Sequence, residues 1–197
     1  MQHRYFSTGT LVAALCIILA PRVAPASCIA ISTEPAFVYC RAVIAPPFTL
    51  GTLYVLAVLF ADQAAEGCTG AEFRIDGFPA GWFKSATPNP AATAIGDPFG
   101  SACAIAFAAC QGGPNQSVLL YTLTYLPTDM LVHSMNVVAA APPYDPQFNC
   151  PVMRLCNGQS YCVSGGYFRF NDLGPCEVAV EPVSWSGVKA LYRDAIQ

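Results

Sequence analysis

The sequence predicts a single, disulfide-stabilised, mainly antiparallel β-sandwich with one short C-terminal helix. Runs rich in β-branched and aromatic residues recur along the chain, with Gly- and Pro-containing turns between them. The chain has 10 cysteines in 197 residues, a density typical of exported domains that use disulfides. A convincing helical spacing of apolar residues occurs only near the C-terminus, after residue 184.

The first 26 residues have the pattern of a secretory signal peptide. His3 and Arg4 give a basic start, residues 11–20 (LVAALCIILA) form an apolar run, and residues 24–26 (APA) form a small-x-small cleavage site. The apolar run is about half as long as a membrane-spanning helix; an uncleaved anchor is the alternative. We therefore expect a secreted protein, extracellular or periplasmic, with a signal peptide at 1–26, a sandwich domain at 27–176 and an extension at 177–197.

The expected strands follow one another with turn signals between them. Residues 48–62 (FTLGTLYVLAVLFAD) alternate and then become apolar throughout, as expected of a central strand covered on both faces. Residues 79–100 contain four prolines and are predicted to be a long loop with Trp82 and Phe83 as a plug. The strands are predicted at residues 28–32, 48–62, 69–77, 102–108, 117–126, 135–140 and 161–170, the last with a kink at Gly165-Gly166.

The C-terminal helix is predicted from its cap and its apolar face. Ser184 is a good N-cap, and Trp185, Val188, Leu191 and Tyr192 follow at helical spacing. The face is short, so we expect the helix to dock on the domain rather than stand alone.

Cleavage of the signal would leave nine cysteines, which is an odd number. The disulfide candidates are Cys40, Cys68, Cys103, Cys110, Cys150, Cys156, Cys162 and Cys176. Cys28 is then unpaired, paired with another chain, or lipid-modified, although Pro25 stands where a lipoprotein signal usually has an aliphatic residue. Bridges among the last four candidates, and one between Cys103 and Cys110, are interpretations that leave the connectivity open.

One segment resembles a known family of modules. A long apolar strand followed by residues 70–75 (GAEFRI), with residues 117–126 (SVLLYTLTYL) as a later core strand, is similar to cohesin modules. This resemblance implies an immunoglobulin-like sandwich and a protein partner, but the cysteines and the terminal helix depart from the cohesin pattern. The whole chain also resembles a group of secreted bacterial β-sandwich proteins, through residues 81–83 (GWF), 87–91 (TPNPA), the block 150–166 and residues 185–192 (WSGVKALY).

Composition and motifs argue against most catalytic and nucleic-acid functions. Nine basic residues against 12 acidic ones give a net charge of −3, which offers little to phosphate backbones. Beyond the signal the chain has one histidine, His133, which is too few for the common triads. The cysteine spacing lacks a C-x2-C pair, so we expect no metal and no cofactor. A calcium site from Asp62, Glu66, Asp76 and Asp97 lacks a supporting D-x-D-x-D run.

Glu72 and Asp76 are the carboxylates weighed for a hydrolase. They share one strand face but lie roughly 13 Å apart along it, farther than glycosidase pairs, with Arg74 between them. Trp82, Phe83 and Tyr144 are aromatic residues in proline-rich segments, which either pack over the end of the sandwich or bind a protein or a carbohydrate.

We therefore expect a non-catalytic structural or binding module at or beyond the cell surface, with a protein or carbohydrate ligand and no membrane span. The alternatives are an extracellular carbohydrate-active hydrolase that uses Glu72 or Asp76, and a lipid-anchored surface protein through Cys28.

Overall fold

The computed structural model describes residues 27–36, 42–60 and 67–172. This part of the chain forms thirteen strands and contains no helix. The predicted signal peptide, the predicted C-terminal helix, Cys40 and Cys176 lie outside the described residues. No helix within the described ranges is long and apolar enough to cross a membrane.

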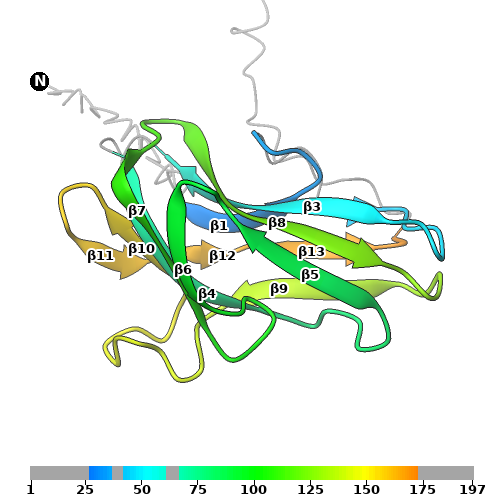
Figure 1. Cartoon of the computed structure of the whole chain (residues 1–197). Helices are drawn as coiled ribbons and strands as arrows, with labels where there is room; N and C mark the ends of the chain where they lie inside the picture. Colours follow the sequence, from blue (N-terminus) through cyan, green and yellow to red (C-terminus); the bar gives the residue numbers. More distant parts are fainter. Residues whose placement is uncertain (1–26, 37–41, 61–66, 173–197) are drawn as a thin grey trace, which may run out of the picture.

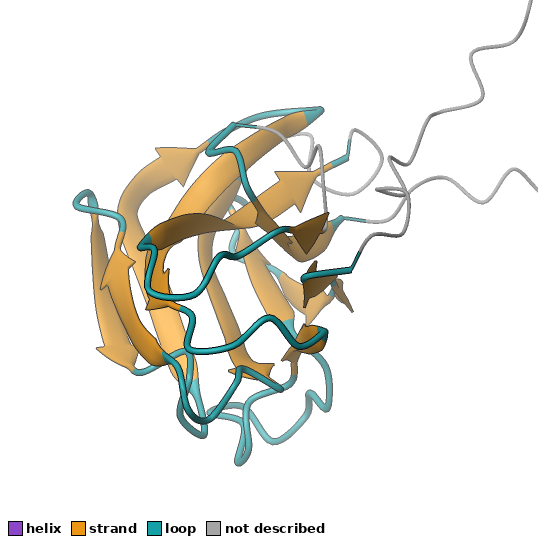
Figure 2. Cartoon of the chain, turned by 90° about the vertical axis from the view of Figure 1, so that its right-hand side faces the viewer, coloured by secondary structure: helices purple, strands orange, loops and turns teal. Residues whose placement is uncertain are grey.

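Two β-sheets pack face to face (Figures 1 and 2). The first sheet has five strands in the order β12-β1-β3-β8-β5, with β3 at its centre. The strands of this sheet are β1 (Cys28–Ser32), β3 (Gly51–Leu59), β5 (Phe83–Pro88), β8 (Gln116–Leu126) and β12 (Ser164–Gly165).

The second sheet is built around β4, which pairs with β10 and then β9 along successive stretches and also with β7. Its main path runs β11-β10-β4-β9-β13-β2, and β6 extends it beyond β7. The strands of this sheet are β2 (Ala42–Val43), β4 (Cys68–Asp76), β6 (Ala92–Gly96), β7 (Cys103–Gln111), β9 (His133–Val138), β10 (Val152–Leu155), β11 (Ser160–Cys162) and β13 (Tyr167–Phe170).

The core lies between the sheets and follows the predicted alternation. On β4, Ala71, Phe73 and Ile75 point inward, while Glu72 and Arg74 are half-buried on the outer face. Because side chains alternate across a strand, each long strand contributes every second residue to the core. The largest fully buried side chains are Tyr121, Phe73, Phe168, Phe170, Ile29, Ile31, Leu53, Leu56, Leu59, Leu120, Leu123 and Met135.

The kink predicted at Gly165-Gly166 is where the chain crosses from one sheet to the other. Gly166 donates its N–H to the carbonyl of Ile29 and accepts the N–H of Val137, at 2.8 Å each. A Cβ at Gly165 would overlap the carbonyl of Val137, so only glycine allows this close approach. The predicted strand 161–170 is therefore three short strands, β11, β12 and β13.

The prediction of a long loop at residues 79–100 is wrong, because this stretch contains β5 and β6. Both are edge strands with mostly exposed small or polar side chains, so they lack the apolar alternation that marks a half-buried strand. Their prolines are compatible with pairing, since Pro88 ends β5 and Pro90 lies in the turn that follows it. β10 and the two-residue β2 were also not predicted.

Two disulfides hold one end of the second sheet. Cys110 at the end of β7 is bonded to Cys156 after β10, and Cys150 is bonded to Cys162 at the end of β11, each with Cα atoms 5.5 Å apart. The predicted Cys103–Cys110 bridge is wrong, since Cys110 takes Cys156 instead.

Cys68 and Cys103 were disulfide candidates but are buried thiols in the structure. Cys103 on β7 lies opposite Phe73 of β4, and Phe73 is five residues along β4 from Cys68. The sulfurs of Cys68 and Cys103 are therefore too far apart to form a disulfide. Both act as small core side chains. Burial raises the pKa of Cys68 to about 11 and that of Cys103 to about 12. Cys28 begins β1 and is half-buried.

Candidate functional site

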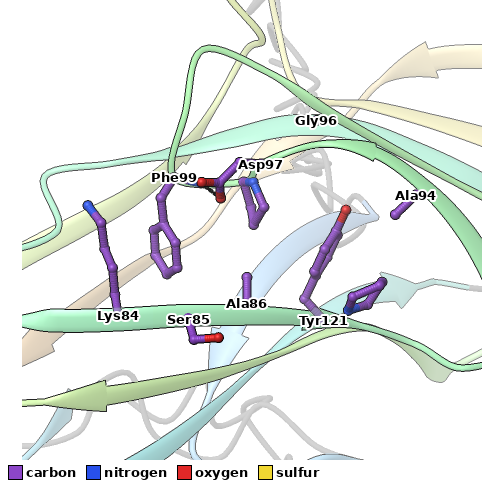
Figure 3. A pocket seen from close by; sticks show the side chains of 10 residues that line it. Lys84, Ser85, Ala86, Ala94, Gly96, Asp97, Phe99 and Tyr121 are labelled. Carbon is purple, nitrogen blue, oxygen red and sulfur yellow. Dashed lines mark hydrogen bonds between the residues drawn. The ribbon is translucent and has the colours of Figure 1, made fainter.

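A groove opens between β5, the edge strand of the first sheet, and β6, which extends the second sheet (Figure 3). The groove has a volume of about 480 Å³. The two strands diverge from the turn at Asn89, whose N–H donates to the carbonyl of Leu120 and whose carbonyl accepts the N–H of Ala92. The residues that line it are Lys84, Ser85, Ala86, Pro88, Ala94, Gly96, Asp97, Pro98, Phe99 and Tyr121.

One wall of the groove is the free edge of β5. In an antiparallel pair, hydrogen-bonded residues alternate with residues whose backbone groups point away. The hydrogen bond from the Asn89 N–H to the Leu120 carbonyl continues the β5–β8 register and shows which β5 residues face β8. Counting back in steps of two, the backbone groups of Thr87 and Ser85 form hydrogen bonds with β8. The N–H and C=O groups of Lys84 and Ala86 therefore face the free edge, with which no described strand pairs.

The floor of the groove carries a buried hydroxyl. Tyr121 is 2% exposed, and its Oη is the one buried side-chain polar atom of the described residues that lacks a hydrogen-bond partner. Figure 3 shows the ring standing up from β8 with the hydroxyl directed across the gap toward the opposite strand. A hydroxyl in this state costs about 1–3 kcal/mol, so a ligand oxygen that accepts a hydrogen bond from it would recover part of that energy.

The polar group beside this hydroxyl is the Cys103 thiol, which donates its own hydrogen bond to the carbonyl of Phe73 (3.3 Å). Sulfur is a weak acceptor, so contact with the thiol satisfies the Tyr121 hydroxyl only poorly. Burial, together with the neighbouring Cys103, raises the pKa of Tyr121. Both groups therefore stay protonated at neutral pH, and Tyr121 acts as a neutral donor rather than as a base.

The mouth of the groove carries one charge of each sign. The Lys84 amine lies over the rings of Phe78 and Phe99, at 5.1 and 5.0 Å from their centroids. Asp97 accepts the N–H of Phe99 at 2.9 Å and so orders its own turn. Lys84 is therefore the cation available to an acidic group of a ligand.

The three aromatic residues proposed for binding do not form one surface. Trp82 is 4% exposed and packs against Phe170, Tyr125 and Phe78. Phe83 and Tyr144 are exposed, but Tyr144 belongs to a loop over the outer face of β4, where it donates its N–H to Glu72 (2.8 Å). A binding role for Trp82 as a stacking platform is therefore wrong, and the packing interpretation holds for it.

The two carboxylates weighed for a hydrolase have different partners. Glu72 lines a groove of about 300 Å³ on the outer face of the second sheet, together with Gly70, Ala104 and Ala106. Asp76 is not among the residues that line this groove and pairs with Arg74 (2.8 Å). Glu72 and Asp76 therefore have different partners and do not line one groove together.

His133 belongs to a hydrogen-bonded cluster that fixes the loop before β9. Asp129 accepts from the Trp82 indole (3.1 Å) and the Leu131 N–H (2.9 Å), and its Oδ1 lies 2.8 Å from Nε2 of His133. The hydrogen bond from His133, followed by that from Trp82, lowers the pKa of Asp129 below its usual 3.8. The sequence offered no signal for this cluster beyond the spacing of Asp129 and His133.

Acid should weaken the Asp129 cluster. A carboxylate whose pKa is lowered by folding stabilises the fold above its unfolded pKa, and this contribution is lost as the pH falls through the lowered value. We expect the indole N–H resonance of Trp82 to shift with a midpoint below pH 3.8, and Asp129→Asn to abolish that transition. Asp145→Asn, at a carboxylate that orders a different turn, is the control and should leave the transition unchanged. A midpoint that persists in Asp129→Asn would refute the assignment.

Comparison with known proteins finds a distant structural likeness to cohesin modules. A cohesin module from a Clostridium perfringens family 33 glycoside hydrolase matches with a TM-score of 0.49 and 8% identity, over 75% of this chain and 98% of the module. A type II cohesin domain from the Acetivibrio cellulolyticus cellulosome gives 0.49 and 12%, over 75% and 96%. A non-cellulosomal cohesin from Archaeoglobus fulgidus gives 0.44 and 12%, over 79% and 97%. No protein-family model and no curated protein matches the sequence. The resemblance noted from the sequence therefore extends, at low identity, to the three-dimensional structure.

Proposed function

We propose that the protein is an exported, non-catalytic binding module that acts at or beyond the cell surface. Its ligand is an extended segment of a partner protein, held in the groove between β5 and β6. The observation that carries the proposal is the combination of an unpaired backbone edge on the wall of this groove with an unpartnered buried hydroxyl, that of Tyr121, on its floor.

Strand addition would satisfy both features at once. A peptide laid along β5 pairs its main chain with the free N–H and C=O groups of Lys84 and Ala86. Every second side chain of the peptide then points into the groove, over Ala86 and toward the Tyr121 hydroxyl. The groove is small, so it suits short side chains with an acceptor oxygen, and Lys84 favours an acidic residue at that end. Pro88 has no N–H and ends the site.

Export and the lack of catalysis are parts of the same proposal. Disulfides at Cys110–Cys156 and Cys150–Cys162 suit an oxidising compartment and so support export. The signal peptide at 1–26, the domain at 27–176 and the extension at 177–197 remain predictions within this proposal. Glu72 and Asp76 have separate partners, so no observation favours the hydrolase. Whether Cys28 carries lipid is answered by the intact mass of the exported chain.

Peptides selected from a random ten-residue library against the full chain test the proposal. Ala86→Pro removes an N–H at the free edge and leaves the bonds to β8 intact, so we expect selected peptides to bind it on the order of tenfold more weakly. Tyr121→Phe should also weaken binding. The matched control is Ser160→Pro on β11, which also removes an N–H at a free strand edge. The hydrogen bond from the Leu155 N–H to the Gln159 carbonyl sets the β10–β11 register, and in that register the Ser160 N–H points away from β10.

Selection that yields no binder, or only peptides whose affinity Ala86→Pro leaves unchanged, would contradict the proposal. Equal losses of affinity in the two proline variants would indicate a general effect on the fold and would also count against it. Binding of oligosaccharides on a glycan array that Ala86→Pro does not alter would replace the peptide with a carbohydrate at another surface.

A further inference from the structure

Exposed apolar side chains gather at one end of the sandwich, and none of them lines the groove between β5 and β6. The described residues include nine exposed large hydrophobic side chains, and seven of them lie on or beside two neighbouring loops. These loops join β2 to β3 and β8 to β9, at the right-hand end in Figure 1, and Figure 2 looks directly onto that end. The seven residues, called the apolar crest below, are Ile44, Phe48, Leu50, Phe83, Met130, Leu131 and Val132.

Hydrogen bonds from beneath hold the two loops together. Asn171 is buried and donates its backbone N–H to Val43 (2.8 Å) and its side-chain amide to the carbonyl of Leu131 (3.1 Å), and its Oδ1 accepts the N–H of Ala45 (2.8 Å). Phe48 donates its N–H to the carbonyl of Pro127 (2.9 Å). These hydrogen bonds therefore hold the two loops of the crest in place relative to each other.

The most exposed residue of the crest is held in an unfavourable backbone conformation. Phe48 has a φ of 58° and is 77% exposed. A bulky residue rarely adopts positive φ, and such strain persists only where the surrounding structure imposes it. The strain projects an aromatic ring into solvent rather than into the core, which points to a role for that ring outside the fold.

The two loops of the crest carry little charge. Residues 44–50 (IAPPFTL) contain no ionisable side chain, and residues 126–132 (LPTDMLV) contain only Asp129. The Asp129 carboxylate is 35% exposed, but it accepts hydrogen bonds from Trp82 and Leu131 and pairs with His133, so the fold compensates part of its charge. Hydroxyl groups of Thr49 and Thr128, both exposed, stand beside the apolar tips.

We propose that the apolar crest inserts into the surface of a lipid bilayer. Its side chains stand on separate loop tips, such as Phe48 at 77% and Leu131 at 66% exposure. A bilayer accepts separate projections without a matching shape, whereas a protein groove must be complementary to all of them. Uncharged tips suit the hydrocarbon boundary, and threonine hydroxyls suit the headgroup level above it. The contact is peripheral and does not depend on what occupies the groove between β5 and β6.

Because the crest carries little charge, we expect its affinity for a bilayer to depend little on the charge of the lipid headgroups. Insertion driven by apolar area alone proceeds on uncharged phosphatidylcholine, and anionic phosphatidylglycerol changes the affinity little. The binding is likewise insensitive to salt, because the contact contains no ion pair for salt to screen.

Tryptophan placed on the crest reports insertion directly. Leu131→Trp in the full chain is mixed with vesicles of phosphatidylcholine brominated on its acyl chains, which quench indoles that reach the hydrocarbon. We expect quenching beyond that of the wild type. The matched control is Ile95→Trp, because Ile95 is 64% exposed but lies on β6 outside the crest, and it should show no added quenching. Wild-type protein corrects for the two native tryptophans.

A second variant measures the contribution of the crest to affinity. Phe48→Ser with Leu131→Ser should lower vesicle affinity on the order of tenfold, whereas Ile95→Ser should not. Vesicle binding without added quenching of Leu131→Trp would overturn the proposal by showing that another part of the chain binds. Binding that requires phosphatidylglycerol would overturn it as well. Self-association that the double variant abolishes, without vesicle binding, would assign the crest to a second copy of the chain instead.

Discussion

Replacing Cys110 and Cys156 together by serine is expected to lower the free energy of unfolding by about 4 kcal/mol. The bond joins residues 46 apart in sequence, so it removes a large loop-closure entropy from the unfolded chain. It also ties the end of β7 to the β10–β11 hairpin past the start of β4, the strand that lies between β7 and β10. The loss should appear as a lower midpoint in guanidinium unfolding, with a changed slope because the unfolded state expands.

The second disulfide provides a graded comparison. Cys150–Cys162 closes a loop of only 12 residues, so its double serine variant should lose about 3 kcal/mol. Cys68→Ala, at a buried thiol that forms no disulfide, tests core packing alone and should leave the slope unchanged. A larger loss from the short loop than from the long one would contradict the loop-entropy account of these bonds.

Asn171→Ala is expected to lower the free energy of unfolding by about 3 kcal/mol. The change removes both side-chain hydrogen bonds and leaves the buried N–H of Ala45 without an acceptor. It also places alanine at a φ of 57°, where a Cβ without asparagine's local hydrogen bonds is unfavourable.

Two further variants separate these causes in chemical denaturation. Asn171→Gly removes the hydrogen bonds but relieves the backbone, so it should cost less than Asn171→Ala. Asn136→Ala on β9 is exposed and should change stability by less than about 0.5 kcal/mol. Equal losses for Asn171→Ala and Asn136→Ala would show that Asn171 does not support the two loops.

The central strands were predictable because their signal is local. β1 has the predicted bounds, β4 and β8 lie within one residue of the predicted ends, and β3 is three residues shorter at each end. The predicted alternation on β4 is confirmed residue by residue. Each of these strands has an apolar face against the core, and that face sets a period of two in the sequence.

The edges of the sheets, and therefore the groove, could not be predicted in the same way. β5 and β6 are defined by partners on β8 and β7 rather than by an apolar face of their own. Their proline-flanked, small and polar residues resemble a loop, and the groove between them was missed for that reason. Tyr121 was assigned to a core strand, but only the packing of the two sheets shows that its hydroxyl has no partner.

The cysteines illustrate the same limit. Their number and the export signal predicted at 1–26 indicated disulfides, and the described part of the chain contains two. Which cysteines pair depends on strand register: Cys103 lies opposite Phe73 rather than near Cys68. Sequence spacing favoured Cys110 for Cys103, whereas the fold brings Cys110 to Cys156.

Hydrogen exchange along β5 tests the proposed binding edge most directly. In the free protein, the amides of Ser85 and Thr87, which bond to β8, should exchange slowly, whereas those of Lys84 and Ala86 should exchange at nearly solvent rates. Saturation with a selected peptide should slow Lys84 and Ala86 and leave the amide of Ser160 on β11 unchanged. Equal protection of the amides of Lys84, Ser85, Ala86 and Thr87 in the free protein, or no change at Ala86 when peptide is bound, would contradict strand addition at this edge.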